Sequence, residues 1–298
     1  MQGSNPSAQI VCDKESNLLI RKIEEKDIIT VVSLIHELNN LPSFYNAYMP
    51  KTLPSIEREI NDAVANGSAL VYEEEGAVKG ILVFFKAPSE VIDMSGPFVV
   101  DEDERIGNAL LETLIKTYEG TKINAFFSKT SSFYISLMEK KGFTLDEYEY
   151  ILSLEKKRFS GTRSVSLRRA REEEKETLTT LKNHIFGDIY ITDTMFKGAS
   201  YYSNTFVLEE EDVIIGLAVM KKENSTTNLE IFGIDSAYRG KGYGKRFLET
   251  LLFEAFEDNE VKSIKLVVDV VNETALNLYK KIGFEIVDRN VSYRLNER

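Results

Sequence analysis

Apolar and polar positions follow a pattern that occurs twice along the chain. Residues 71–80 (VYEEEGAVKG) resemble residues 207–216 (VLEEEDVIIG), and each segment is typical of a strand, an acidic turn and a second strand. Three more segments match in the same order, at offsets of 137 to 147 residues: 20–25 with 167–172, 111–114 with 248–251, and 137–143 with 278–284. Four ordered matches predict two copies of one α/β unit, each of roughly 135–140 residues.

Each copy has the same predicted order of elements. An opening strand leads into a helix, and after a less regular stretch three strands precede a long amphipathic helix. A strand, a short helix, a Gly-Phe pair and a last strand then close the copy. The expected positions are a first helix at 26–39 or 172–185, strands near 68–73, 78–86 and 94–101 or near 204–209, 213–221 and 227–235, and a long helix at about 107–118 or 243–257.

The link between the copies is expected near residue 160. Residues 159–163 (FSGTR) are mostly small or polar and lie between two strand patterns. The first residues are rich in Gly, Ser, Asn and Pro, so we expect a disordered tail over residues 1–17. The sequence thus predicts a first domain over residues 18–160 and a second over residues 161–298.

Composition narrows the class of protein. The 298 residues are 43% hydrophobic, which suits two packed domains of about 150 residues. Asp and Glu exceed Lys and Arg by 48 to 37, and this net charge of −11 argues against non-specific nucleic-acid binding. The single cysteine, Cys12, excludes an internal disulfide framework. No apolar run resembles a membrane span or a signal peptide, so a soluble cytoplasmic protein without nucleic-acid or membrane partners is expected.

The glycine-rich segment 239–245 (RGKGYGK) is the main candidate for chemistry. It follows an apolar strand and opens a helix with an apolar face, so its backbone N–H groups can converge on an anion at the helix N-terminus. The four cations there, Arg239, Lys241, Lys245 and Arg246, face the unfavourable end of the helix dipole, at a cost of about 0.3–1 kcal/mol each. A bound multivalent anion would remove this conflict. The alternative is an ordinary tight turn with solvated lysines. The spacing fits neither a P-loop nor a dinucleotide-binding motif.

The second copy resembles the GNAT N-acyltransferase superfamily, whose cofactor turn reads Arg/Gln-x-x-Gly-x-Gly/Ala. Arg239, Gly242 and Gly244 satisfy that pattern. Residues 267–272 (VVDVVN), Leu278-Tyr279 and Gly283-Phe284 resemble the family's next strand and helix. The resemblance covers both copies in architecture and only the second in motif. It implies two tandem GNAT-like domains, each a mixed, mostly antiparallel twisted sheet flanked by helices.

The resemblance also implies acetyl-coenzyme A as the co-substrate. Its pyrophosphate would lie on the turn, and its pantetheine arm would pair with the strand before the turn. Gly233 permits close backbone approach there, although a bulge without a ligand is the alternative. Asn272 matches a residue that contacts the pantetheine arm, and it could equally cap a helix. The implied coenzyme-binding residues are Phe232, Gly233, Ile234, Arg239, Gly240, Lys241, Gly242, Tyr243, Gly244, Lys245, Asn272 and Tyr279.

Two residues are expected to carry catalysis. Tyr279 matches the family's tyrosine that protonates the leaving sulfur, and the alternative is a core aromatic residue. Glu230 is the candidate general base because strand alternation puts it on the face of Phe232 and Ile234; the alternative is a solvated glutamate. Asp269 is a weaker candidate. His184 could line the acceptor cleft, and a packed or surface histidine is the alternative. Phe186, Tyr190, Tyr201 and Tyr202 lie where the family builds that cleft, and core packing or a contact with the first domain is the equal alternative. No metal site is expected.

The first copy departs from the motif at the turn. We align Val100 with Ile234, and the following segment 101–108 (DEDERIGN) is three residues shorter, acidic and keeps only Gly107. Acids before a helix suit its dipole and would repel a pyrophosphate. Met138 replaces Tyr279, and Ser131 replaces Asn272. The first domain is therefore expected to have the fold without a cofactor site.

The resulting prediction is an acetyl-coenzyme A-dependent N-acetyltransferase. It would move an acetyl group to a primary amine of a small molecule or peptide by direct transfer in a ternary complex. The alternative is an acyl-coenzyme A sensor or regulatory module without catalysis. Aminoacyl transfer from tRNA conflicts with the acidic net charge and the intact coenzyme turn. The acceptor, the acyl length and the oligomeric state are left open by the sequence.

Overall fold

The computed structural model describes residues 9–13, 18–86, 91–186 and 204–296. The chain divides into two compact units, which are described separately. Unit 1 comprises residues 1–148 with 290–298, and unit 2 comprises residues 149–289. Within the described residues, no helix is long and apolar enough to cross a membrane.

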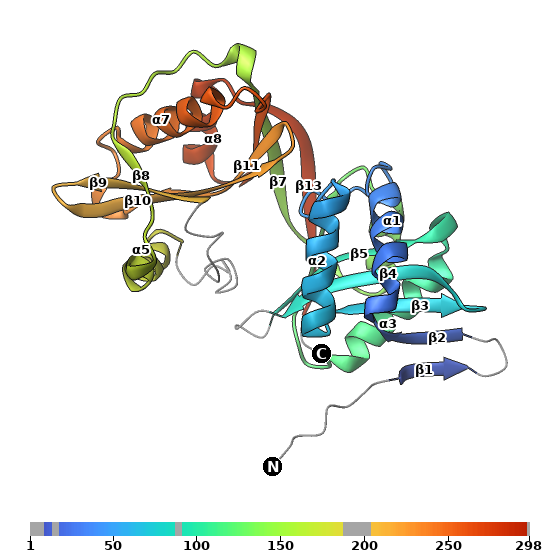
Figure 1. The fold of residues 1–298 in the computed structure, drawn as a ribbon. Coiled ribbons are helices and arrows are strands. Elements are labelled where there is room, and N and C mark those ends of the chain that lie inside the picture. The colour runs from blue at the N-terminus through green and yellow to red at the C-terminus, as the bar shows by residue number, and fades with distance from the viewer. Residues whose placement is uncertain (1–8, 14–17, 87–90, 187–203, 297–298) are drawn as a thin grey trace. The chain divides into compact units, whose positions relative to one another are not determined.

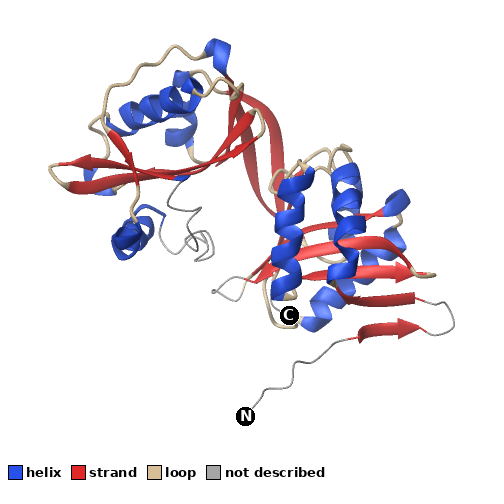
Figure 2. Cartoon of the chain, viewed as in Figure 1, coloured by secondary structure: helices blue, strands red, loops and turns tan. Residues whose placement is uncertain are grey.

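Unit 1 combines a sheet with α-helices (Figures 1 and 2). Its strand order is β1-β2-β3-β4-β5-β6-β13, and among the described residues the neighbouring strands are antiparallel except β5 with β6. Helices α1 and α2 lie side by side. The bounds are β1 Gln9–Asp13, β2 Leu18–Lys22, η1 Glu25–Asp27, α1 Ile28–Leu38, α2 Leu53–Asn66, β3 Ala69–Glu74, β4 Ala77–Lys86, β5 Ile92–Val99, η2 Val100–Glu102, α3 Glu104–Thr117, β6 Ile123–Ser128, α4 Ser132–Lys140, and the end of β13 Glu285–Leu295.

Unit 2 repeats this plan with the strand order β7-β12-β11-β10-β9-β8, in which only β11 and β12 run parallel. Helices α7 and α8 cover one face of the sheet, and α5 covers the other (Figure 1). The bounds are β7 Thr144–Glu155, η3 Lys156–Arg158, β8 Leu167–Arg169, η4 Glu172–Glu174, α5 Lys175–Phe186, β9 Thr205–Glu210, β10 Val213–Glu223, β11 Thr226–Ile234, η5 Ser236–Tyr238, α7 Tyr243–Glu257, β12 Ser263–Asp269 and α8 Glu273–Ile282. The predicted repeat and α/β fold class are confirmed.

The last strands of the two copies are exchanged. Residues 149–155 of β7, from the first copy, pair with β12 of unit 2. Residues 290–295 of β13, from the second copy, pair with β6 of unit 1. Their apolar side chains are buried accordingly: Leu152 and Leu154 in the unit 2 core, and Val291, Tyr293 and Leu295 in the unit 1 core. The single boundary expected near residue 160 therefore differs from the division into compact units.

The expected tail also needs a correction. Residues 9–13 form β1, which pairs antiparallel with β2, so the prediction of disorder over residues 1–17 is wrong for this segment. Residues 1–8 and 14–17 lie outside the described part of the chain. Polar composition suggested a tail, but Ile10 and Val11 are β-branched residues, which favour a strand.

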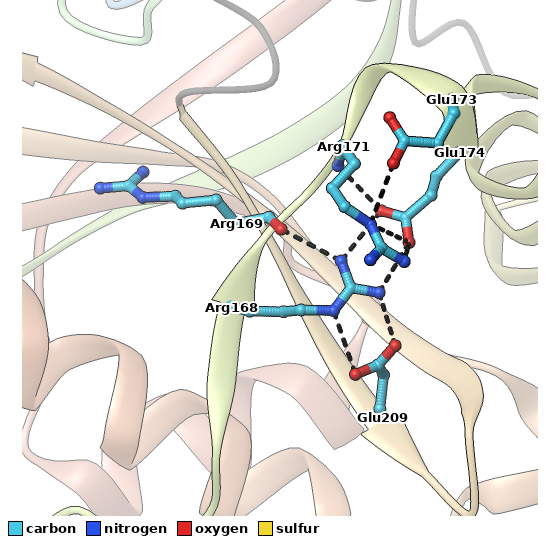
Figure 3. A network of polar contacts seen from close by, with 6 residues as sticks. All are labelled: Arg168, Arg169, Arg171, Glu173, Glu174 and Glu209. Atoms are coloured by element: carbon cyan, nitrogen blue, oxygen red, sulfur yellow. Dashed lines mark hydrogen bonds and ion pairs between the residues drawn. The ribbon is translucent and has the colours of Figure 1, made fainter.

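Matching ion networks join β2 to η1 in unit 1 and β8 to η4 in unit 2. In unit 2, the Arg168 guanidinium donates to Glu174 at 2.7 and 2.9 Å and to Glu209 at 3.0 Å (Figure 3). The hydrogen bonds from Arg168 lower the pKa of Glu174 to about 2. In unit 1, Arg21 donates to Asp27 at 2.6 and 2.9 Å and to Glu73 at 2.7 Å. The equivalent positions of the two networks support the internal repeat.

Candidate functional site

The glycine-rich turn of unit 2 has the backbone conformation that its sequence requires. After η5, Gly240 and Gly242 have φ angles of 78° and 80°, a region that side chains disfavour. A Cβ atom placed on either residue would have no heavy atom within 4 Å in the described part of the chain, apart from the adjacent residues. The glycines are therefore required by the backbone and not by close packing, and the space next to each is open.

Helix α7 begins at this turn without a side-chain cap. Gly242 is the N-cap and has no side chain, and the first turn contains no acidic residue. The first intrahelical bond runs from Arg246 N–H to Gly242 O at 3.2 Å. The N–H groups of Tyr243, Gly244 and Lys245 thus have no partner inside the helix. Such an end is well suited to an anion.

Gly244 fits the motif for a different reason. A Cβ atom there would lie 3.8 Å from Ile234 Cγ1 and 3.9 Å from Leu278 Cδ2, which are ordinary contact distances. An alanine would therefore fit, and this agrees with the Gly/Ala choice at that motif position. The residue keeps α7 close to the end of β11 and to α8.

The strand before the turn leaves one edge open. β11 pairs with β12 from Thr226 to Leu229 only, and a β-bulge at Glu230 follows. Beyond it, among the described residues, no strand pairs with that edge. Asp235 N–H donates to Ile215 O at 2.8 Å, so alternation directs the backbone groups of Phe232 and Ile234 to the open edge and those of Gly233 to β10.

Gly233 is explained by helix packing. A Cβ atom on this residue would lie 2.4 Å from Ile185 Cγ2 and 2.9 Å from Phe186 Cζ, both at the end of α5. These distances exclude any side chain without movement of α5. The suggested alternative of a bulge at Gly233 is wrong, because the bulge lies at Glu230.

The basic side chains around the turn differ in their contacts. The Arg239 guanidinium is hydrogen-bonded to backbone carbonyls, with Nε 2.9 Å from Ile234 O and a terminal nitrogen 3.2 Å from Ile185 O. Lys241 lies 5.4 Å from the Tyr238 ring, and Lys245 lies 3.6 Å from Glu249. Lys241 and Lys245 thus supply positive charge beside the turn, whereas Arg239 is bonded to the backbone of the turn and of α5.

Tyr243 and Arg246 lie on the first turn of α7. The Arg246 guanidinium lies over the Tyr243 ring at 4.8 Å from its centroid. A hydrogen bond with Glu210 raises the pKa of the Tyr243 hydroxyl. Tyr243 therefore stays neutral next to the helix terminus, and an anion there meets no added negative charge from this residue.

Tyr279 is a core residue that carries a protonated phenol. Its side chain is 7% exposed and packs 6.5 Å from the Phe232 ring and 5.7 Å from the Phe284 ring, measured between centroids. Burial raises its pKa to about 12, so the phenol is protonated at neutral pH. The hydroxyl has no hydrogen bond to another described side chain.

Asn272 serves as the N-cap of α8. Its Oδ1 accepts a hydrogen bond from Ala275 N–H at 3.1 Å. This geometry satisfies one of the two roles considered for the residue. The carboxylate of Asp269, the weaker base candidate, accepts from Val271 N–H at 3.1 Å and so shapes the same loop.

The bulge changes the position of Glu230. Leu229, and not Glu230, packs in the core with Phe232 and Ile234. The extra residue interrupts strand alternation, so alternation no longer assigns Glu230 to the face of Phe232 and Ile234. Its carboxylate lies 4.0 Å from Lys221 Nζ, and both side chains are partly exposed. The sequence of this strand contained no signal that predicted the bulge.

The acceptor candidates are only partly described. His184 is exposed, and its Nδ1 lies 3.8 Å from Asp235 Oδ2. Phe186 ends α5. Tyr190, Tyr201 and Tyr202 lie outside the described residues. The sequence also gave no hint that Tyr150, from the exchanged strand β7, would pack in the unit 2 core and accept a hydrogen bond from Arg289 at 2.7 Å.

Unit 1 has different chemistry at the equivalent turn. Gly80 pairs with Val99 as Gly216 pairs with Ile234, so the counterpart of Ile234 is Val99 and the predicted alignment with Val100 is wrong by one residue. The Asp103 side chain caps α3 by accepting from Arg105 N–H at 2.8 Å. The first turn of α3 also contains Glu104.

Aromatic side chains fill the strand end of unit 1. β5 pairs with β6 only from Ile92 to Met94. Tyr134 is fully buried, and its ring lies 5.2 Å from Phe127 on β6, 6.5 Å from Phe98 on β5, and 5.7 Å from Phe44. Phe44 is thus a core residue of unit 1, whereas Tyr48 is about half exposed.

Comparisons with known proteins agree with these features. The sequence profile of the acetyltransferase (GNAT) family matches residues 167–284. Over 86 residues the chain is 33% identical to "Probable N-acetyltransferase san" of Drosophila melanogaster, a match that covers 28% of this chain and 47% of that protein. The chain spans about a third to a half of the length of the first curated relatives it matches.

Solved structures resemble the fold over most of the chain. A GCN5-related N-acetyltransferase from Sphaerobacter thermophilus has a TM-score of 0.73 and 14% identity, over 94% of this chain and 96% of that chain. A tandem GNAT protein from the clavulanic acid biosynthesis pathway has a TM-score of 0.67 and 14% identity, over 94% and 99%. Over residues 167–284 the chain is similar to the GNAT acetyltransferase family.

Proposed function

We propose that unit 2 is an acetyl-coenzyme A-dependent N-acetyltransferase and that unit 1 has the same fold without a coenzyme site. The observation that carries this proposal is the N-terminus of α7. It has no cap and no acid in its first turn, two glycines in left-handed conformations precede it, and Lys241 and Lys245 lie beside it. This combination favours a multivalent anion such as a pyrophosphate.

The coenzyme would be held mainly by the backbone. The N–H groups from Gly240 to Lys245 would receive the pyrophosphate, with Lys241 and Lys245 as supporting charges. The pantetheine arm would lie along the open edge of β11 and bond the backbone of Phe232 and Ile234 as an added strand. Because Ile234 O accepts from Arg239, the N–H of Ile234 and both groups of Phe232 are the candidates for this pairing.

Transfer would proceed directly from the thioester to the amine. The neutral amine nitrogen attacks the carbonyl carbon, the C–N bond forms and the C–S bond breaks. The amine proton leaves to a base, for which Glu230 is the candidate through water, and Tyr279 protonates the departing sulfur. Deprotonating a lysine-like amine at pH 7 costs about 4–5 kcal/mol, which positioning and the base must offset.

A coenzyme-binding sensor without catalysis is the second candidate. It is favoured by the bulge at Glu230, because strand alternation no longer assigns this residue to the face expected for a base. It is also compatible with Tyr279 as a core residue. Turnover is therefore the observation that separates the two candidates.

Calorimetry and a turnover screen test this proposal. Titration with coenzyme A should give one site per chain, and two sites per chain would contradict the assignment of unit 1. Acetyl-coenzyme A consumption is then measured with polyamines, aminoglycosides, amino acids and peptide N-termini as acceptors. Binding without turnover on any amine class would favour the sensor.

A further inference from the structure

Arg239 joins the end of a strand to a helix of unit 2. Its Nε donates to Ile234 O, at the end of β11 and close to α7, at 2.9 Å. A terminal guanidinium nitrogen donates to Ile185 O, in the last turn of α5, at 3.2 Å. The planar fork of arginine suits this double contact, whereas the ammonium of lysine is a single point of charge.

Two further contacts hold the same junction. The lack of a side chain at Gly233 lets Ile185 and Phe186 pack against the β11 backbone, since an added Cβ atom would be 2.4 Å from Ile185. His184 Nδ1 lies 3.8 Å from Asp235 Oδ2. The last turn of α5 is thus in contact with the segment 233–239 at three separate points.

The charge of Arg239 also suits this place. Carbonyl groups in the last turn of a helix have no intrahelical partner, and basic side chains bond them favourably. Ile185 lies next to the last residue of α5, where positive charge suits the helix dipole. The next residue after Arg239 begins the segment 240–245, whose N–H groups are proposed to hold the coenzyme. One side chain therefore links the end of α5 to the start of that segment.

We propose that Arg239 is a positioning residue that fixes the end of α5 to the coenzyme turn and couples the two, so that coenzyme binding stabilises the last turn of α5. The coupling rests on the proposed function of the turn. By linkage, any partner that binds better to the ordered end of α5 gains affinity when coenzyme is present. If Arg239 only contacted a phosphate of the coenzyme, coenzyme binding would not be expected to stabilise the last turn of α5.

The first test uses hydrogen exchange of the free full-length protein. In Arg239→Lys and Arg239→Gln, amides 183–186 should exchange about tenfold faster or more, because the bridge to Ile185 O is lost while only the second variant loses charge. Lys241→Gln is the matched control and should leave exchange at 183–186 unchanged. Wild-type exchange in Arg239→Lys would overturn the positioning role, as would unchanged exchange in Arg239→Gln.

The second test adds coenzyme A at saturating concentration. In the wild type, exchange should slow both at 240–246 and at 183–186; in Arg239→Lys it should slow at 240–246 only. Equal slowing at 183–186 in both proteins would overturn the coupling, as would coenzyme binding that is lost in Arg239→Lys but kept in Lys241→Gln. If coenzyme A changes neither segment of the wild type, the proposed function fails and the coupling with it, while the first test still decides whether Arg239 fixes α5.

Discussion

The two units place opposite charges at the same point of the fold. In unit 1 the Asp103 side chain caps α3, and Glu104 adds negative charge in the first turn. In unit 2 the glycine cap of α7 leaves the N–H groups open, and cations surround them. The N-terminus of α3 is stabilised by the protein's own side chains, whereas the N-terminus of α7 is suited to stabilisation by a bound anion. A repeated fold can therefore keep its core and lose or gain an anion site within one turn.

The strand ends next to these helices differ in a related way. In unit 1 the rings of Phe44, Phe98 and Phe127 surround Tyr134. In unit 2 the edge of β11 beyond Glu230 pairs with no strand among the described residues. Unit 1 thus uses its strand end as core, and this supports the proposal that it has no coenzyme site.

The largest effect is expected from Gly242→Glu, which should remove the proposed anion site that distinguishes unit 2 from unit 1. The substitution adds a carboxylate where the pyrophosphate is proposed to lie, so coenzyme A binding measured by calorimetry should fall below detection. Gly120→Glu in unit 1 is the matched control, because Gly120 has a φ of 76° and open space like Gly242. Both variants carry a strain of about 1–3 kcal/mol, so a similar loss in melting temperature is expected. Retained affinity in Gly242→Glu would contradict the site.

Tyr279→Phe should separate binding from catalysis. Loss of the phenol proton is expected to lower the turnover rate about 10²–10⁴-fold, with the affinity for coenzyme A unchanged. Tyr134→Phe in unit 1 is the control, since its hydroxyl is buried without a partner among the described residues and its removal should be neutral or stabilising. Unchanged turnover in Tyr279→Phe would favour another proton donor.

The pKa of Tyr279 gives a further expectation within the same experiment. Because burial raises it to about 12, the phenol stays protonated through neutral and moderately alkaline pH. Between pH 7 and 10 the turnover rate should show no loss attributable to this residue. A fall in that range that disappears in Tyr279→Phe would contradict the assignment.

The strand exchange can be tested with two matched core variants. Leu154→Ala lies in the first copy by sequence but should destabilise unit 2, and Leu295→Ala lies in the second copy but should destabilise unit 1. Each removes a buried leucine side chain, at an expected cost of about 2–5 kcal/mol. Hydrogen exchange across the sheet of each unit reports where the loss falls. Destabilisation that follows the sequence copy would contradict the exchange.

The sequence predicted the features that depend on neighbouring residues, but it did not predict which strands pair with each other. Helix faces, turns and the glycine motif depend on neighbouring residues, so the repeat, α7 and the open turn were all predicted from the sequence. The exchange of β7 and β13 was missed because both strands alternate in the same way, and alternation does not specify which strand is the partner. The bulge at Glu230 and the carbonyl contacts of Arg239 depend on tertiary geometry, and the sequence had no signal for either.

The smallest expected difference concerns the two ion networks. In unit 1, burial tends to raise the pKa of Asp27, but hydrogen bonds from Arg21 and Glu24 N–H lower it overall; in unit 2, Arg168 lowers the pKa of Glu174 to about 2. Each carboxylate therefore contributes stability above its unfolded pKa, and this contribution is lost as the pH falls toward its folded pKa.

Asp27→Asn should cost unit 1 about 1–3 kcal/mol at pH 7, and Glu174→Gln should cost unit 2 less. The reason is exposure: the Arg21 side chain is 7% exposed and its second partner Glu73 is 24% exposed, against 28% for Arg168 and 38% for Glu209. Water replaces a lost contact more readily in the exposed network. Denaturant unfolding at pH 7 and pH 3 measures both effects, and both deficits should shrink at pH 3. A larger loss in Glu174→Gln would mean that burial does not set the strength of these networks.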